Sequence, residues 1–172
     1  MKKILIIITL TLVLILCNAC GDTSQKLTDD AIIALIDIDL QISKFLYTEP
    51  PASNYSDTAE YNGREYYRVE EEEFDTWDEW EAFIRGAYCG QLAEDALATD
   101  TVVNIEGNTY SDGGSRGYDL SDNYTYEITS SDGNTVTVLM RNPSRDPEDN
   151  YVNETTYTFK LTNDGWRIEN KF

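Results

Sequence analysis

The sequence TVTVLM at residues 135–140, followed by YVNETTYTFKL at 151–161 and WRI at 166–168, decides the fold. In each stretch β-branched or aromatic residues alternate with polar ones, a pattern typical of a strand with one buried face. The triplet Asn163-Asp164-Gly165 is a turn signal between the last two stretches. Short strands separated by turns predict an antiparallel meander at the C-terminal end of the chain.

Further short strands are expected before this meander. Residues 124–129 alternate between polar and apolar or aromatic residues, and a turn at residues 132–134 separates them from the next strand. Residues 102–105 are mostly β-branched, which favours another short strand. Glycines at positions 107, 113, 114 and 117 then predict a loop around Tyr110.

A long helix is expected near the start of the folded part. Thr28 followed by two aspartates is typical of a helix N-terminus, where acidic side chains face the positive end of the helix dipole. Apolar residues then recur at spacings of four and three from Ala31 to Phe45. Every second residue from 36 to 42 is also apolar, which would suit a strand. We favour the helix because its apolar seam continues to Phe45 before Pro50-Pro51 ends it.

A hairpin and two more helices are expected between this helix and the strands. Residues 49–60, rich in proline, serine and acid, are expected to form a loop, and Asn62-Gly63 predicts the turn of a hairpin whose second strand spans 65–69. Thr76 and Glu79 have the spacing of a capping box at the start of an aromatic helix. Residues 92–97 fit a second, short helix.

Helices followed by consecutive strands indicate an α+β fold. We expect N-terminal helices packed on one face of a curved antiparallel meander sheet, in a cone similar to cystatins and to nuclear transport factor 2. A chain of this length usually forms one domain, which we place at residues 28–172.

The N-terminal residues have the pattern of an export signal. Two lysines precede an apolar run from Ile4 to Cys17, which is shorter than the roughly 20 residues of a spanning helix. The run ends in Ala19-Cys20-Gly21, which resembles the lipobox of bacterial lipoproteins. We therefore expect residues 1–19 to be a signal peptide. The alternatives are an uncleaved membrane anchor and lipid attachment at Cys17.

Cleavage before Cys20 makes this cysteine the lipid attachment site and residues 20–27 a lipidated tether. The protein would be anchored to the cell membrane by its lipid and would face outside. Removing residues 1–19 takes away two lysines and no carboxylate, so the net charge falls from −19 to −21 over the remaining 153 residues. Such a negative domain repels nucleic acid and anionic lipid, and its natural partners are basic surfaces or cations.

The residue types exclude several kinds of enzyme. The chain has no histidine, so Ser-His-Asp and Cys-His catalytic arrangements are impossible. Cys89 is the remaining thiol after lipidation and lies in an apolar stretch, where we expect it to be buried and inert. No segment matches a calcium loop, a zinc site or a phosphate-binding loop. We expect a protein that is not an enzyme and uses no metal or cofactor; a proton-transfer pocket of Tyr and Asp is the enzymatic alternative.

Two acidic stretches are candidates for a partner-binding surface. An acidic run such as Glu70–Glu73 is most often a solvated surface, and an aromatic helix face such as the one that follows it is most often part of the core. The functional interpretation of the acidic run is that it forms half of a docking surface. A basic partner would be attracted by such a surface. The candidate partner-binding residues are Glu70, Glu71, Glu72, Asp75, Asp146, Glu148 and Asp149.

Several motifs resemble the IseA-type DL-endopeptidase inhibitor family over about residues 61–172. They are Tyr66–Val69, Phe74–Trp80 with the helix to Leu97, Val103–Tyr110 with the glycines that follow, and Leu161–Ile168. Members of that family are exported proteins of Gram-positive bacteria that inhibit cell-wall DL-endopeptidases, which are cysteine peptidases, by blocking the active-site cleft. The resemblance implies an acidic face offered to a basic enzyme cleft, and it carries over no individual contact residue.

The lipid anchor departs from the secreted members of the family and puts shared targets in doubt. The strand-turn-Trp ending at residues 161–168 also occurs in domains similar to nuclear transport factor 2. The alternative function is therefore a small-ligand-binding or sensing domain at the cell envelope. A deep apolar pocket would favour that alternative, and an open groove lined by carboxylates would favour the inhibitor.

Replacement of Cys20 tests the anchor. Cys20→Ala should abolish incorporation of a labelled fatty acid, because the thioether-forming sulfur is gone, whereas Cys17→Ala should leave the labelling unchanged. Labelling that persists in Cys20→Ala and disappears in Cys17→Ala would place the lipid on Cys17.

Overall fold

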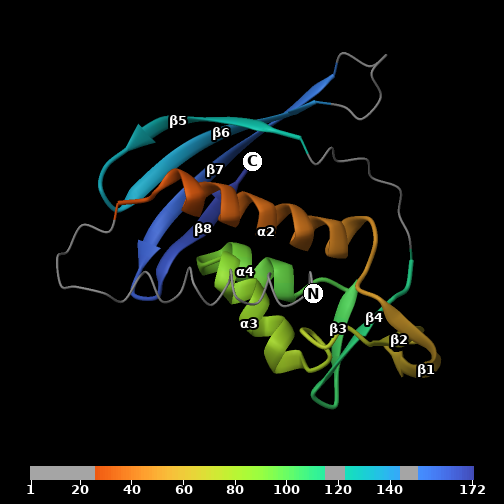
Figure 1. Ribbon diagram of the computed structural model, residues 1–172. Helices are drawn as coiled ribbons and strands as arrows, with labels where there is room; N and C mark the ends of the chain where they lie inside the picture. Colours follow the sequence, from red (N-terminus) through yellow and green to blue (C-terminus); the bar gives the residue numbers. More distant parts are fainter. Residues whose placement is uncertain (1–25, 115–122, 144–150) are drawn as a thin grey trace.

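The computed structural model describes residues 26–114, 123–143 and 151–172. Its elements are α2 (Asp29–Tyr47), β1 (Ser53–Tyr61), β2 (Arg64–Val69), α3 (Trp77–Ala87), α4 (Gly90–Leu97), β3 (Val102–Ile105), β4 (Asn108–Ser111), β5 (Thr125–Ser131), β6 (Thr135–Pro143), β7 (Val152–Thr162) and β8 (Gly165–Lys171). The strands form two four-stranded antiparallel sheets, in the orders β1-β2-β4-β3 and β5-β6-β7-β8. Helix α2 lies along one face of the β5–β8 sheet with α3 and α4 beside it, and β1–β4 lie beyond its C-terminal end (Figure 1).

The α+β class and the C-terminal meander are confirmed, but the expectation of a single sheet is wrong. Residues 53–60, part of the loop expected at 49–60, belong to β1, and Tyr110, also expected in a loop, lies in β4. The pattern of β1 is hidden because a register shift between Asn54 and Thr58 interrupts the alternation and most of its side chains are exposed. Strand β4 is short and flanked by glycines, which is why its sequence favoured a loop.

The helical interpretation of the first segment is confirmed. The side chain of Thr28 accepts a hydrogen bond from the Ala31 amide at 3.2 Å, and the helix continues to Tyr47. Its buried stripe consists of Ile32, Leu35, Ile36, Asp39, Ile42, Phe45 and Leu46. One member of this stripe is a carboxylate, and burying a charge is costly unless it is paired and hydrogen-bonded.

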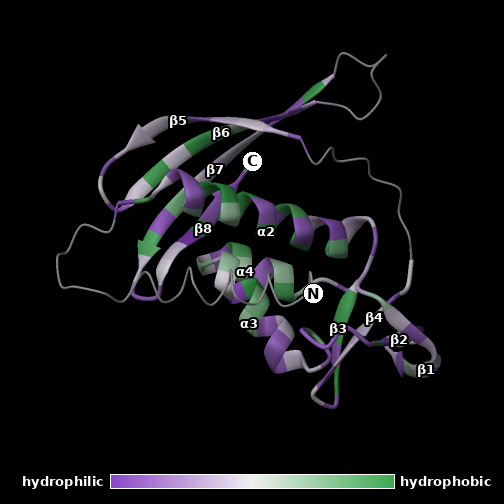
Figure 2. Ribbon diagram, viewed as in Figure 1, coloured by the Kyte–Doolittle hydropathy of each residue, from purple (hydrophilic) through white to green (hydrophobic). Residues whose placement is uncertain are grey.

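Aromatic rings join α2 to α3. The ring of Phe45 on α2 lies 5.7 Å from Phe74, 6.2 Å from Trp80 and 6.5 Å from Phe83, measured between centroids. Trp80 is fully buried, so the aromatic face of α3 belongs to the core, as expected. Strands β6, β7 and β8 all contribute buried residues to this core, and the alternation of hydrophobic residues is visible along β6 (Figure 2).

The β1–β4 sheet has a small core of its own, made of Tyr66, Val103 and Tyr110 with Ala59 and Ile105 packed against them. Its β1–β2 hairpin turns at Asn62-Gly63, whose φ angles of 52° and 76° are both positive, as a type I′ turn requires. The predicted hairpin turn is therefore confirmed. We call β1–β4 the small lobe, and α2, α3 and α4 with β5–β8 the large lobe.

The N-terminal predictions lie largely outside the described residues. Residues 1–25, which include the signal peptide and Cys20, are not described, and Leu27 at the end of the expected tether is buried in the main core. Among the helices of the described ranges, none has the length and apolar character needed to cross a membrane.

The capping box of α3 yields a stability prediction. The Glu79 amide donates to the Thr76 hydroxyl at 3.4 Å, and the Thr76 amide donates to the Glu79 carboxylate at 3.0 Å. Thr76→Ala should lower the free energy of unfolding in urea by about 1 kcal/mol, and Thr76→Ser should retain it. An alanine variant as stable as the unmodified protein would show that the cap does not stabilise α3.

Candidate functional site

The predicted acidic run connects β2 to α3, and two of its carboxylates hold the start of β1. Glu70 accepts a hydrogen bond from the side-chain amide of Asn54 at 2.8 Å. Glu71 accepts one from the backbone amide of Ala52 at 3.1 Å. These two side chains therefore have a structural role, and they attach the acidic run to the strand beside it.

The remaining carboxylates of the run face solvent. Glu72 and Glu73 are exposed, and neither makes an ion pair within the described part of the chain. The Asp75 carboxylate is partly exposed and lies 3.9 Å from the Arg68 guanidinium. We call residues 70–75 the acidic segment. Because its charges are mostly uncompensated, it can attract a basic surface.

The structure brings together some of the predicted partner-binding residues. Glu70, Glu71, Glu72 and Asp75 lie together on the acidic segment. The other three, Asp146, Glu148 and Asp149, lie outside the described residues, so the meeting of the two acidic stretches stays a prediction.

The charge of the acidic segment extends over the neighbouring hairpin. Residues 53–78 contain nine carboxylates and two arginines, a formal charge of −7. Arg64 pairs with Asp100 at 2.9 Å, and Arg68 faces Asp75. The two cations of this stretch are thus already engaged by carboxylates, and the surface stays strongly negative.

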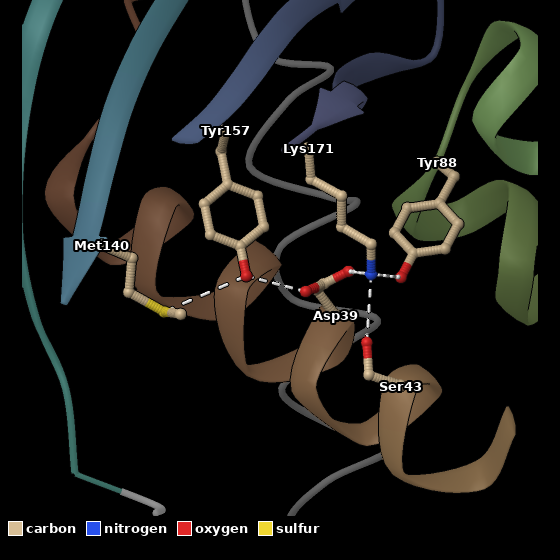
Figure 3. A network of polar contacts seen from close by, with 6 residues as sticks. All are labelled: Asp39, Ser43, Tyr88, Met140, Tyr157 and Lys171. Atoms are coloured by element: carbon tan, nitrogen blue, oxygen red, sulfur yellow. Dashed lines mark hydrogen bonds and ion pairs between the residues drawn. The ribbon is translucent and has the colours of Figure 1, made fainter. Parts of the chain in front are cut away.

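A second cluster lies in the large lobe, around the buried carboxylate of Asp39 (Figure 3). The Tyr157 hydroxyl donates to one carboxylate oxygen at 2.7 Å, and the Lys171 ammonium donates to the other at 2.6 Å. The Tyr88 hydroxyl donates to the same oxygen as Lys171. Lys171 also donates to Ser43 at 3.0 Å and to the Tyr88 hydroxyl at 3.2 Å. We call these residues the Asp39 cluster.

The electrostatics of this cluster keep both tyrosines protonated. Burial and then the negative charge of Asp39 raise the pKa values of Tyr88 and Tyr157 far above the usual tyrosine range. Both hydroxyls therefore stay protonated near neutral pH and act as hydrogen-bond donors to Asp39. With Lys171 they compensate the buried carboxylate and join α2 to the end of α3, to β7 and to β8.

Sequence reasoning missed the Asp39 cluster, although a signal was present. Asp39 follows Leu35 by four residues and precedes Ile42 by three, so it lies on the apolar stripe of the predicted helix. A carboxylate in such a stripe indicates that donors face it from other elements. The identity of those donors was not readable, because they lie 49, 118 and 132 residues away along the chain.

An open pocket of about 330 Å³ adjoins the Asp39 cluster, at the low end of the usual range for ligand sites. Besides cluster residues it is lined by Leu40, Tyr47, Met140, Asn153 and Thr155. All three Lys171 N–H donors already have protein acceptors. The pocket thus offers mainly apolar walls and neutral polar groups.

The described residues provide little for covalent or metal chemistry. Cys89 is half-buried rather than buried, and burial, followed by the charge of Glu169, raises the pKa of its thiol. The reactive thiolate is therefore disfavoured. Within the described ranges no group of three or more metal-ligating side chains could hold a metal ion.

The sequence matches a family model described as IseA DL-endopeptidase inhibitor over residues 23–171. The matched range contains every described helix and strand. It thus starts well before residue 61, where the motif resemblance began. No curated protein matches the chain.

Replacement of Asp39 tests the cluster. Asp39→Asn should lower the free energy of unfolding by about 3 kcal/mol, because Lys171 keeps its charge in a largely buried site and loses its counter-ion. Asp37→Asn is the control, since Asp37 is exposed and accepts one hydroxyl, from Tyr124 at 2.8 Å. It should cost less than about 1 kcal/mol.

A second variant separates charge from packing. Adding Lys171→Met to Asp39→Asn should restore part of the lost stability, because the unpaired ammonium is removed. Equal losses for Asp39→Asn and Asp37→Asn in urea unfolding would contradict the role given to the cluster.

Proposed function

Because this chain belongs to the IseA DL-endopeptidase inhibitor family, we propose that it is an exported, membrane-anchored protein that binds and inhibits a cell-wall DL-endopeptidase. The family match over residues 23–171 is the observation that carries the inhibitor role, and the anchor rests on Ala19-Cys20-Gly21 after the apolar run. The acidic segment supports it, because the expected partner presents a basic cleft. The partner is a cysteine peptidase in this proposal, and inhibition consists of occupying its active-site cleft.

Electrostatic attraction is the proposed source of fast and selective binding. Exposed charges that match the partner mainly steer the encounter and set specificity. Glu72 and Glu73 suit this role, because they face solvent and make no ion pair in the described part of the chain. Glu70 and Glu71 contribute charge while also holding β1.

We propose a role without catalysis for the chain itself. The absence of histidine removes the usual general base, and the half-buried Cys89 has a raised pKa. Inhibition by cleft occupation needs a stable surface rather than a reactive group.

The proposed lipid on Cys20 would keep the inhibitor at the outer face of the membrane. Tethering raises the effective concentration of the domain for enzymes working close to that surface. The inhibitor would then restrain wall hydrolysis near the membrane. Freely diffusing enzyme farther out would be less affected.

Small-ligand binding is the second candidate, and the pocket beside Asp39 is the observation that favours it. The pocket is open, and its charged side chains, Asp39 and Lys171, are paired with each other, so neither charge is available to a ligand. The family match therefore favours the inhibitor. If ligand binding is the function, filling the pocket with Ser43→Phe should abolish it. If the protein acts through its acidic segment, Ser43→Phe should leave inhibition of the endopeptidase unchanged.

Salt and charge variants test the proposed inhibition. The purified protein should inhibit peptidoglycan hydrolysis by a cell-wall DL-endopeptidase at low salt. The association rate should fall between 0.01 M and 0.1 M salt, since the Debye length shortens from about 30 Å to about 10 Å. Glu72→Gln combined with Glu73→Gln should slow association by about threefold at low salt.

A matched control removes the same charge elsewhere. Asp30→Asn with Asp164→Asn neutralises two exposed carboxylates in the large lobe, and it should change the association rate much less. If the unmodified protein leaves the endopeptidase fully active even at low salt, the inhibitor proposal is wrong and ligand binding becomes the leading function.

A further inference from the structure

Strand β1 has an irregularity in its pairing with β2, next to the acidic segment. Asn54 pairs with Arg68 and Thr58 pairs with Tyr67, so residues 55–57 have no opposite partners on β2. Within this irregularity the Ser56 amide donates to the Asn54 side chain at 2.9 Å. The irregularity leaves the Tyr55 side chain 67% exposed.

The exposed ring of Tyr55 is nevertheless held in place. It packs on Tyr67 with centroids 4.8 Å apart and an interplanar angle of 58°. Both rings lie over Gly113, where an added Cβ would be 2.7 Å from the Tyr67 ring and 3.3 Å from the Tyr55 ring. The φ of Gly113 is +65°, so backbone and space both require glycine there. We call Tyr55 and Tyr67 the tyrosine pair.

Carboxylates adjoin the tyrosine pair. Asn54, the neighbour of Tyr55 in sequence, binds Glu70 of the acidic segment. Glu65 accepts the Tyr67 hydroxyl at 3.1 Å, and Asp57 is exposed two residues after Tyr55. An exposed aromatic face beside carboxylates attracts a cation through both the ring quadrupole and charge.

We propose that the tyrosine pair receives a lysine or arginine side chain of the partner endopeptidase and anchors the complex. This inference rests on the proposed function and deepens it by naming a contact residue. The formal charge of −7 over residues 53–78 provides the complementarity to a basic partner. Tyrosine is one of the residue types enriched among binding hot spots.

Three substitutions of Tyr55 test the contact. With a purified cell-wall DL-endopeptidase, Tyr55→Ala and Tyr55→Leu should raise the Kd by about tenfold, because both remove the aromatic face. Tyr55→Phe should bind within about twofold of the unmodified protein, because the ring remains. Phe172→Ala, which removes an exposed ring (73%) at the end of the β5–β8 sheet, is the control and should bind normally.

The outcomes separate this inference from the proposed function. Melting temperatures should be alike for all four variants, since both side chains are exposed. If the unmodified protein binds and Tyr55→Ala binds equally well, the proposed contact at the tyrosine pair is wrong and the inhibitor proposal stands. If Tyr55→Leu binds as well as Tyr55→Phe, the contact is apolar and the cation is wrong. If the unmodified protein itself neither binds nor inhibits, both proposals fail.

Discussion

One buried carboxylate constrains the large lobe. Asp39 lies on the apolar stripe of α2, where the cost of removing a charge from water is several kcal/mol unless donors compensate it. Tyr157, Tyr88 and Lys171 supply those donors from β7, the end of α3 and β8. Because each donor satisfies the charge from one direction, α2 has one favourable position on the sheet. Apolar and aromatic side chains pack around α2 in that position.

The division into two lobes separates stability from the proposed docking. The large lobe holds the main core and the Asp39 cluster. The small lobe has a core of three residues, and much of β1 is exposed. Hydrogen bonds from Ala52 and Asn54 to Glu71 and Glu70 tie the acidic segment to β1. Substitutions of its unpaired carboxylates therefore change the charge of the surface with little effect on the core.

The parts of the fold that depend on local signals were predictable. The Thr28 cap, the Asn62-Gly63 turn, the Thr76 capping box and the C-terminal meander follow from short-range spacing and were found as expected. Strand β1 was missed because its irregular residues 55–57 break the period of two that identifies a strand.

The same distinction applies to the sites. The acidic segment could be predicted as a unit, because its residues are contiguous in sequence. The Asp39 cluster and the tyrosine pair could not, since each depends on contacts between distant segments. The one sequence signal for the Asp39 cluster was Asp39 itself, a carboxylate within the apolar stripe of α2. Nothing in the sequence around Tyr55 indicated that Tyr67 and Gly113 would fix its ring.

The central claim is that the small lobe and its acidic segment meet a DL-endopeptidase while the large lobe supports them. Amide hydrogen exchange of the protein with and without the endopeptidase tests this most directly. We predict slower exchange in the complex at residues 53–78, with exchange in α2 and β5–β8 unchanged. Protection confined to α2 and β5–β8, around the pocket beside Asp39, would contradict the claim.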